Sequence, residues 1–313
     1  MINLLYCIDE NYNEQLLTSL NSILDNLNTK INLYIIHENP KSFEEKKEII
    51  FNNPKINEIH VTKFDDLNYS FPKIEDSHVS KATYFRMYIS QHIDSKVDRI
   101  LYVDPDVVCI NSFQNDYSNI FEQMDQKFTI GVYTASTLED HNKLMFKELN
   151  IKEKYFNAGV MFINLKKWRE DKITDALIDT MDNIKESIQY WDQDVLNSYF
   201  DGDYFEIQEK FNFIVYSKKR ISELDEDEVV FIHYAGTNKP WYLESGINKI
   251  SKYYQNQYFK YNDRYHINIK NTKNSIFALF KGVINLELFF MCMYPLKYLI
   301  QAIKKIFKIK LVN

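Results

Sequence analysis

Two acidic side chains, Asp104 and Asp106, flank a proline directly after the short apolar segment 99–103. Two carboxylates this close repel each other, and apolar neighbours on both sides make their charge costly unless a cation lies between them. A divalent cation that prefers oxygen ligands is the natural partner. An exposed acidic turn is the alternative for the tripeptide alone, and the flanking apolar residues favour the metal.

A second set of polar residues follows another apolar segment, in the stretch FIHYAGTNKPW at 231–241. His233 is a candidate metal ligand. Gly236 permits a close backbone approach to a phosphate, and Lys239 supplies a point charge for it. A lone histidine at such a place is more often structural, but His, Gly and Lys at this spacing favour a metal and diphosphate site.

Polar and aromatic side chains alternate at 190–194. Carboxylate and amide groups such as those of Asp192 and Gln193 suit sugar hydroxyls, and the aromatic faces beside them suit the apolar face of a sugar ring. The alternative is a helix N-terminus at which Asp192 or Asp194 is the cap. The two interpretations are compatible.

Five further positions are candidates for binding. Asn157, in an expected small-residue turn, either binds a ligand or shapes the turn. Arg86, in an expected helix, pairs either with a diphosphate or with a structural acid. Asp9, Asn11 and Tyr12 follow the first expected strand. A nucleotide base could stack on Tyr12 and form hydrogen bonds with Asp9.

The elements that must position these residues alternate between two types. Strands are expected at 3–8, 31–37, 56–61, 99–103, 128–133, 159–165 and 229–233, and helices at 14–27, 42–51, 80–93, 173–188 and 193–200. Ser42 and Glu45 form a capping-box pattern. This alternation predicts an α/β fold with a mostly parallel sheet, in which ligands gather at the carboxyl ends of strands.

Cysteine content and charge narrow the class of protein. Cys7, Cys109 and Cys292 are odd in number and far apart, which excludes a disulfide framework and favours a reducing, cytoplasmic location. Residues 247–313 contain 12 Lys+Arg and 2 Asp+Glu, a balance of +10. Since the net charge of the whole chain is −6, residues 1–246 have a net charge of −16. The acidic body argues against nucleic-acid binding, and the basic end predicts contact with an anionic membrane.

The end of the chain has a helical pattern of its own. From Pro295 onward apolar residues share one face, and lysines fall elsewhere or flank it: Leu296, Leu299, Ile300, Ile303, Ile306 and Phe307 against Lys297, Lys304, Lys305, Lys308 and Lys310. This pattern is typical of a helix on a membrane surface or of a terminal helix packed on its domain. Charged residues interrupt every apolar run before the roughly 20 residues that span a bilayer.

Taken in order, these segments resemble glycosyltransferase family 8, the group of bacterial lipopolysaccharide galactosyl- and glucosyltransferases and glycogenin. The resemblance runs from residue 2 to about 245. Its seven motifs are CIDENY at 7–12, SKATYFR at 80–86, DPD at 104–106, YFNAGV at 155–160, NLKKWR at 164–169, DQD at 192–194 and HYAGTNKPW at 233–241. One departure is Cys7, where small residues such as Ala are common.

The resemblance implies a GT-A type domain, a UDP-sugar donor, Mn²⁺ with Mg²⁺ as the alternative ion, and retention of anomeric configuration. It implies that the metal is bound by Asp104, Asp106 and His233. The nucleotide and diphosphate would be held by Cys7, Asp9, Asn11, Tyr12, Asp104, Gly236 and Lys239. The residues facing the donor sugar, and so the catalytic candidates, would be Asp192, Gln193, Arg86 and Asn157.

We therefore expect a catalytic domain at 1–245 and a basic, amphipathic helical region at 246–313. The expected function is transfer of galactose or glucose from a UDP-sugar to a glycan, glycolipid or glycoprotein, as in cell-surface polysaccharide biosynthesis in bacteria. The expected location is the cytoplasm, with peripheral contact at the inner face of the membrane. The alternatives are a sugar-phosphate nucleotidyltransferase, which usually has a glycine-rich loop where this chain has Asp9-Glu10-Asn11-Tyr12, and a non-catalytic membrane-surface sugar-binding module.

Overall fold

The computed structural model describes residues 1–65, 71–72, 80–125, 127–137, 143–152, 154–215 and 224–308. The chain divides into two compact units. The first unit comprises residues 1–17, 26–105 and 112–212, and the second comprises 18–25, 106–111 and 213–313. Lys310, which the sequence places at the end of the basic helix, lies outside the described residues.

The first unit is built around one sheet. Its described strands are β1 (Ile2–Ile8), β2 (Ile31–His37), β3 (Ile56–Lys63), β4 (Arg99–Val103), β6 (Ile130–Thr137), β7 (Lys154–Asn164) and β8 (Phe205–Glu206), in the order β3-β2-β1-β4-β7-β6-β8. All neighbouring pairs are parallel except those of β7, which runs antiparallel to β4 and β6. The expected mostly parallel α/β sheet is confirmed.

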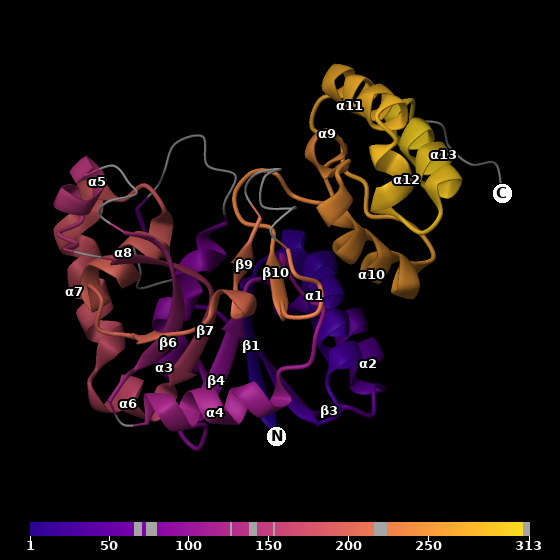
Figure 1. Ribbon diagram of the computed structural model, residues 1–313. Coiled ribbons are helices and arrows are strands. Elements are labelled where there is room, and N and C mark those ends of the chain that lie inside the picture. The colour runs from indigo at the N-terminus through magenta and orange to yellow at the C-terminus, as the bar shows by residue number, and fades with distance from the viewer. Residues whose placement is uncertain are drawn as a thin grey trace. The chain divides into compact units, whose positions relative to one another are not determined.

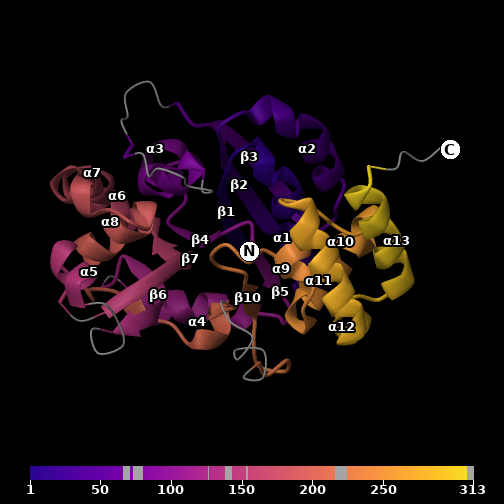
Figure 2. The ribbon, with the colours of Figure 1, turned by 90° about the horizontal axis from the view of Figure 1, so that it is seen from above.

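Helices cover both faces of this sheet. The helical segments of this part of the chain are η1 (Glu10–Tyr12), α1 (Asn13–Asn26), η2 (Pro40–Phe43), α2 (Glu44–Phe51), η3 (Lys81–Tyr88), α3 (Ile89–His92), α4 (Gln114–Met124), α5 (Lys143–Glu148), α6 (Leu165–Glu170), α7 (Ile173–Ile184), η4 (Lys185–Ser187), α8 (Trp191–Phe200) and η5 (Glu209–Phe211). Seen from above, α3, α6, α7 and α8 lie on one side of the sheet and α2 and α4 on the other (Figures 1 and 2). Strands covered on both faces are apolar over most of their length, as β1 is apart from Asn3.

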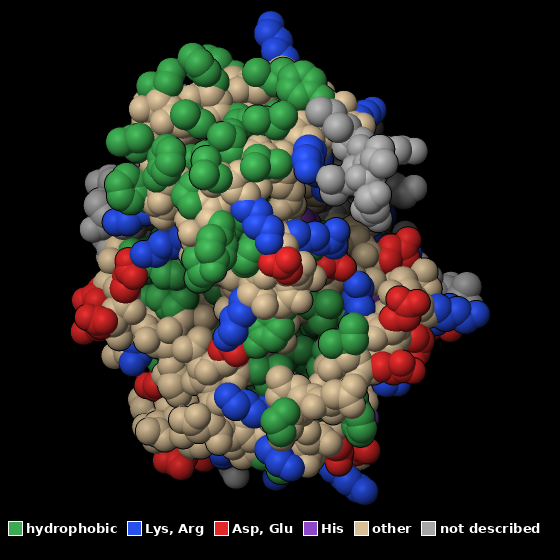
Figure 3. Space-filling view, turned by 90° about the vertical axis from the view of Figure 1, so that its right-hand side faces the viewer, with side chains coloured by type: hydrophobic (Ala, Val, Ile, Leu, Met, Phe, Trp, Pro, Cys, Tyr) green, Lys and Arg blue, Asp and Glu red, His purple; other side chains and the backbone are tan. Residues whose placement is uncertain are grey.

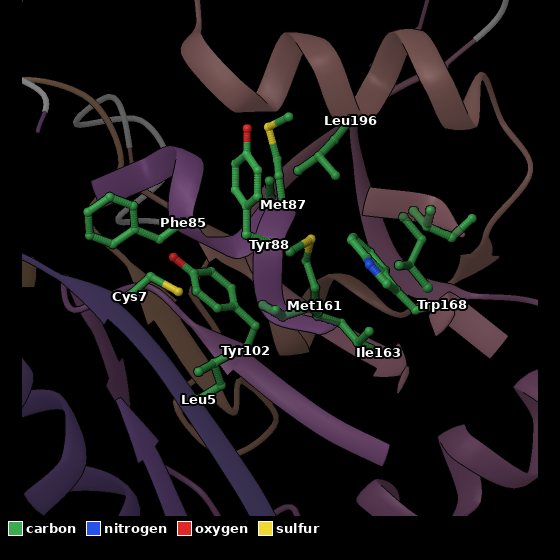
Figure 4. Close-up of a cluster of buried hydrophobic side chains, with 14 of the residues drawn as sticks. Leu5, Cys7, Phe85, Met87, Tyr88, Tyr102, Met161, Ile163, Trp168 and Leu196 are labelled. Atoms are coloured by element: carbon green, nitrogen blue, oxygen red, sulfur yellow. The ribbon is translucent and has the colours of Figure 1, made fainter. Parts of the chain in front are cut away.

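The main core lies between the sheet and the helices on the α8 side. In Figure 4, Cys7 of β1 and Tyr102 of β4 lie close together beside η3, whose Phe85 and Tyr88 belong to the same buried cluster. Leu196 of α8 belongs to the same cluster and lies on the side away from the strands. The carboxyl ends of β1 and β4 are therefore fixed against η3 and α8, the two elements that carry Arg86 and Asp192.

Two expected helices differ from the structure, one in its start and one in its type. The Ser42 hydroxyl does not cap a helix; it donates to the Asn39 carbonyl at 2.8 Å, and α2 begins at Glu44 without a side-chain cap. The segment expected as an α-helix at 80–93 is the 3₁₀ helix η3 followed by one turn, α3. Residues 84–88 of η3 are all buried, whereas an amphipathic α-helix would leave one face in solvent.

The second unit combines a small sheet with a helical C-terminal region. Its described elements are β5 (Val107–Cys109), β9 (Phe213–Ile214), β10 (Phe231–His233), α9 (Leu243–Gly246), η7 (Lys249–Ser251), α10 (Lys252–Asn262), α11 (Thr272–Ile284), α12 (Glu287–Met291) and α13 (Pro295–Ile306). In the sheet, β10 lies between β5, which is antiparallel to it, and β9, which is parallel. The expected helical C-terminal region is confirmed. Over the described ranges, no helix has the length and apolarity needed to cross a bilayer.

Candidate active site

Asp104 directly follows β4, at the carboxyl end of that strand. Tyr102 lies two residues earlier, so its side chain leaves the strand on the same side. Its hydroxyl donates to Asp104 Oδ1 at 2.5 Å, and burial raises the pKa of Tyr102, which keeps the phenol protonated as a donor. The Asp104 N–H donates to the Gly159 carbonyl of β7 at 2.8 Å. One oxygen of Asp104 is thus oriented by the protein.

Arg86 lies buried beside this carboxylate and joins several elements. Its Nε and Nη2 donate to the two carboxylate oxygens of Asp192 in α8, the Nη2–Oδ1 distance being 3.1 Å. Its Nη1 donates to Asp104 Oδ1 at 3.2 Å and to the Ala158 carbonyl at 2.6 Å. A forked pair of this kind is the geometry in which a buried charge is compensated. The structure brings these three predicted residues together, and both Asp192 oxygens bind Arg86.

Asn157 and Gln193 form a second group of predicted residues. The Asn157 amide donates to Gln193 Oε1 at 3.1 Å, and the Ala158 N–H donates to the same oxygen at 3.0 Å. The Gln193 amide donates to the Tyr155 hydroxyl at 3.1 Å. The turn expected at 156–160 is wrong, because these residues belong to β7, whose pairing with β6 shifts register there. The shift accounts for the turn-like composition of this stretch.

Two buried asparagines that the sequence analysis did not select hold this part of β7. The Asn197 side chain accepts from the Phe156 N–H at 2.7 Å and donates to the Phe156 carbonyl at 2.9 Å. The Asn212 amide donates to Asn157 Oδ1 at 2.9 Å. Both side chains are buried, and both lie among apolar neighbours in the sequence. An amide inside an apolar run is the signal that could have identified them.

The alternative interpretation of Asp192 or Asp194 as the cap of α8 is wrong. Tyr190 precedes the helix, and neither Asp192 nor Asp194 accepts from its first turn. The Asp194 carboxylate instead accepts from the Tyr155 hydroxyl at 2.5 Å and from the N–H groups of Gln189 and Tyr190 at 2.7 Å each. Asp194 therefore fixes the loop before α8 and supports Tyr155.

The residues expected to hold a nucleotide base follow β1. Asp9 is buried, and its Oδ1 accepts from the Asn11 N–H at 2.8 Å, which makes it the cap of η1. Asn11 is exposed and Tyr12 is half-buried, so this turn presents side chains to solvent. Cys7 lies buried in the strand below, and burial raises the pKa of its thiol. The Cys7 thiol is therefore neutral and is not a candidate nucleophile.

The second unit positions Asp106 opposite His233, because β5 and β10 pair antiparallel with Val107 facing His233. His233 Nε2 lies 3.4 Å from Asp106 Oδ1. The ligand atoms of Asp104, Asp106 and His233 all lie within 4.8 Å of one another. Two carboxylates and an imidazole are a ligand set for a divalent cation of the first transition row.

Lys239 reaches the same carboxylate from the loop after β10. Its Nζ donates to Asp106 Oδ2 and, at 2.9 Å, to the Tyr234 carbonyl. Gly236, between them, has a φ of +75°, a left-handed conformation that favours glycine. Although burial opposes it, the Lys239 ammonium group, with His233 beside it, holds the pKa of Asp106 below its usual range. Asp106 is thus an anion over the whole physiological pH range.

Comparison with known proteins adds three likenesses. Residues 3–244 match the model of glycosyl transferase family 8. The chain is 26% identical to a lipopolysaccharide 1,2-glucosyltransferase of Escherichia coli over 81% of its own length and 76% of that protein, and 30% identical to a lipopolysaccharide 1,3-galactosyltransferase of Salmonella typhimurium over 55% and 52%.

Among solved structures, the galactosyltransferase LgtC in complex with donor and acceptor sugar analogues superposes with a TM-score of 0.64. The sequences are 23% identical, and the match covers 77% of this chain and 89% of that one. The likeness shows the GT-A fold predicted from the sequence, with a central mostly parallel sheet flanked by helices.

Proposed function

Because the chain belongs to glycosyltransferase family 8, we propose that it moves a hexose, galactose or glucose, from a UDP-sugar to an acceptor hydroxyl with retention of anomeric configuration. The acceptor proposed is a glycan, glycolipid or glycoprotein of the bacterial cell surface. The relatives named lipopolysaccharide glucosyl- and galactosyltransferases support hexose as the transferred group.

The metal proposed is Mn²⁺, with Mg²⁺ as the alternative, held by Asp104, Asp106 and His233. The residues present fit such an ion. Within the described part of the chain, buried Asp106 Oδ1 accepts no hydrogen bond, and the imidazole that faces it is 3.4 Å away. A buried acceptor of this kind is costly unless a cation is bound. When bound, the ion supplies charge neutralisation to the diphosphate leaving group.

The donor is proposed to lie along the carboxyl ends of β1 and β4. Asp9, Asn11 and Tyr12, with Cys7 below them, are proposed to contact the uridine. Gly236 and Lys239 are proposed to hold the diphosphate, for which the positive φ of Gly236 and the ammonium group supply a backbone approach and a charge.

The sugar is proposed to face Arg86, Asn157, Asp192 and Gln193. Since Arg86 binds both Asp192 oxygens, Asp192 is poorly placed to attack the anomeric carbon as a nucleophile. This geometry supports attack by the acceptor on the face that the UDP leaves. The bond from the anomeric carbon to the UDP oxygen breaks, the bond to the acceptor oxygen forms, and a phosphate oxygen of UDP takes the acceptor proton. Gln193 is proposed to stabilise the positive charge on the sugar, for which its Oε1 would have to turn away from the Asn157 amide and the Ala158 N–H that donate to it.

The observation that carries the proposal is the convergence of Asp104, Asp106 and His233. The test measures UDP release from UDP-galactose, UDP-glucose and their N-acetyl forms, one at a time, with Mn²⁺ or with EDTA. The expected result is Mn²⁺-dependent turnover of one donor that Asp106→Asn abolishes, while Asp175→Asn, at an exposed position of α7, leaves it unchanged. Mn²⁺-dependent turnover retained in Asp106→Asn would refute the metal assignment.

Two further measurements separate the alternatives. A nucleotidyltransferase would release pyrophosphate from a nucleoside triphosphate, and the turn after β1 has no glycine for a triphosphate loop. A sugar-binding module would bind a UDP-sugar without releasing UDP.

We keep the division into a catalytic part at 1–245 and a basic helical region at 246–313 as part of the proposal. That region is proposed to touch an anionic membrane from the cytoplasmic side. Nucleic acid is not a proposed partner, because residues 1–246 are strongly acidic.

A further inference from the structure

A series of hydrogen bonds leads from a buried carboxylate to two half-buried amides. Asp194 Oδ1 accepts from the Tyr155 hydroxyl at 2.5 Å, and the Tyr155 oxygen accepts from Gln193 Nε2 at 3.1 Å. Gln193 Oε1 accepts in turn from Asn157 Nδ2 at 3.1 Å. Asp194 and Tyr155 are buried, whereas Gln193 and Asn157 are half-buried. We call these four residues the amide relay, which begins in the core and ends at side chains proposed to face the donor sugar.

Asp194 sets the direction of the relay, because an ionised carboxylate accepts hydrogen bonds and donates none. Its second oxygen accepts from the N–H groups of Gln189 and Tyr190 at 2.7 Å each. Burial raises the pKa of Tyr155, so the phenol keeps its single proton and gives it to Asp194. The Tyr155 oxygen is then left as an acceptor, and Gln193 must turn its amide nitrogen toward it.

The other end of the relay agrees with this direction. The Ala158 N–H donates to the Gln193 amide at 3.0 Å, so the atom that it meets must be the oxygen Oε1. Asn157 Oδ1 accepts from the Gly159 N–H at 3.0 Å and from Asn212 Nδ2 at 2.9 Å, which makes Asn157 Nδ2 the donor to Gln193. Because backbone N–H groups only donate, the orientation of both amides is fixed from both ends of the relay.

The direction of the relay decides what the two amides offer to a ligand. The oxygen of each amide accepts two hydrogen bonds within the protein. Each amide nitrogen has two hydrogens, and the relay uses one of them. The second N–H group of Asn157 or Gln193 is a donor suited to a hydroxyl or ring oxygen of a sugar. A reversed relay would turn oxygens in place of these donors toward the ligand.

We propose that Tyr155 and Asp194 are positioning residues for sugar transfer, which orient Gln193 and, through it, Asn157 so that amide N–H groups face oxygen atoms of the donor sugar. Both positioning residues are buried, so they act through Gln193 and not by contact with the sugar. This inference rests on the proposed function, in which Gln193 and Asn157 face the sugar.

Tyr155→Phe tests the role of the relay in transfer. The substitution removes one hydroxyl group and leaves the Gln193 N–H without its acceptor. It should lower kcat for UDP release by about tenfold or more, because misoriented amides no longer hold the sugar in the reacting geometry. Mn²⁺-dependent UDP binding, measured by calorimetry, should stay unchanged, since the residues proposed to bind UDP lie outside the relay. A general disturbance of the site would weaken both.

Two results of this measurement would overturn the inference. An unchanged kcat in Tyr155→Phe would show that the orientation of the amides does not matter for transfer. An increased kcat would show that the relay only restrains the turn of Gln193 Oε1 toward the sugar.

Asp194→Asn reverses the buried end of the relay at nearly constant volume. The asparagine oxygen must stay with the two backbone N–H groups, so the new amide nitrogen faces the Tyr155 oxygen. The phenol then lies between two donors, and its own proton has no acceptor in the relay. Asp194→Asn should therefore lower kcat at least as much as Tyr155→Phe, and a kcat equal to that of the unmodified protein would overturn the inference.

A double-mutant cycle tests the relay without any turnover. If the phenol transmits the reversal, Asp194→Asn should lower the urea midpoint of unfolding in the unmodified protein and lower it less in Tyr155→Phe. Equal shifts in the two backgrounds would overturn the relay. Absence of turnover by the unmodified protein with every donor would refute the proposed function, whereas the urea cycle would still decide whether the relay exists.

Tyr254→Phe is the matched control, because it also removes a buried hydroxyl group, one that forms a hydrogen bond with His266 Nδ1 at 2.7 Å in the second unit. It should leave kcat unchanged. Exposed hydrophobic side chains of α11–α13 gather in the upper part of Figure 3, so all variants are measured in the same non-ionic detergent to prevent self-association from lowering kcat. A kcat lowered equally in Tyr254→Phe and Tyr155→Phe would overturn the special role of the relay.

Discussion

Replacing Lys239 by methionine should make the protein bind Mn²⁺ more tightly when no nucleotide is present. In the structure the Lys239 ammonium group donates to Asp106 and to the Tyr234 carbonyl, so it stands beside a carboxylate of the proposed metal site. An ion entering without the donor would have to displace this internal cation. With the donor bound, the diphosphate would accept from Lys239 and leave the carboxylate to the metal.

The magnitude follows from the bonds that the ion must replace. A hydrogen bond to a charged group contributes about 1.5–3 kcal/mol, and the Lys239 side chain, which is only 15% exposed, recovers part of this in water. Lys239→Met should therefore lower the Mn²⁺ dissociation constant by roughly 10- to 100-fold without UDP. In the unmodified protein UDP should produce a tightening of similar size, because its diphosphate would accept from Lys239; by reciprocity Mn²⁺ should tighten UDP binding by the same factor.

Electron paramagnetic resonance of free Mn²⁺ measures this binding directly, with and without UDP and without any turnover. Lys249→Met, which removes an exposed lysine of η7, is the control for net charge. If Lys239→Met and the unmodified protein bind Mn²⁺ equally in the absence of UDP, Lys239 does not compete with the metal and the reasoning fails.

Three further substitutions test the packing around the site. Arg86→Lys keeps the charge but loses the forked geometry, so urea denaturation should show unfolding free energy lower by about 2–3 kcal/mol together with reduced donor hydrolysis; unchanged stability would contradict the role of the fork. Burial lowers the pKa of His37, whose Nδ1 accepts from the Asn39 N–H at 2.8 Å, so the unfolded chain takes up the proton first as pH falls. The contribution of His37 to the unfolding free energy should be complete above about pH 6.5 and decline below it. Urea denaturation above and below that pH should show a smaller decline for His37→Gln than for the unmodified protein. A Cβ on Gly246 would lie 2.5 Å from the Pro240 carbonyl oxygen, so Gly246→Ala should lower the unfolding free energy by about 1–3 kcal/mol in the same assay, and an unaltered value would show that the loop yields freely.

The parts of the site that follow strand ends were predictable from the sequence, because a strand end fixes where its next residue lies. Asp104 and Asp106 come directly after an apolar run, and His233 ends another. Tyr102 was also within reach, since its place two residues before Asp104 puts both side chains on one side of the strand. The pairing of Arg86 with Asp192, 106 residues apart, was not, because no local pattern specifies which acid a buried arginine meets.

The groups that hold β7 were not predicted because their partners are backbone atoms. Asn197 binds the N–H and carbonyl of Phe156. Almost every residue has these two backbone groups, so the sequence does not indicate which residue is the partner. Composition likewise misled at 156–160, where small residues mark a register shift inside a strand and not a turn. The division of the apolar residues of α13 between core and solvent depends on neighbouring helices and could not be obtained from one helix alone.

The basic helical region at 246–313, which we propose to touch an anionic membrane, has a consequence for how the protein meets its acceptor. An enzyme held there would search for its acceptor in two dimensions, and the encounter rate would depend on the acceptor's density in the lipid surface. Dilution of a membrane-borne acceptor with inert lipid would then slow transfer even when its total amount in the sample is constant. Addition of empty vesicles would slow it too, by spreading enzyme and acceptor over separate particles.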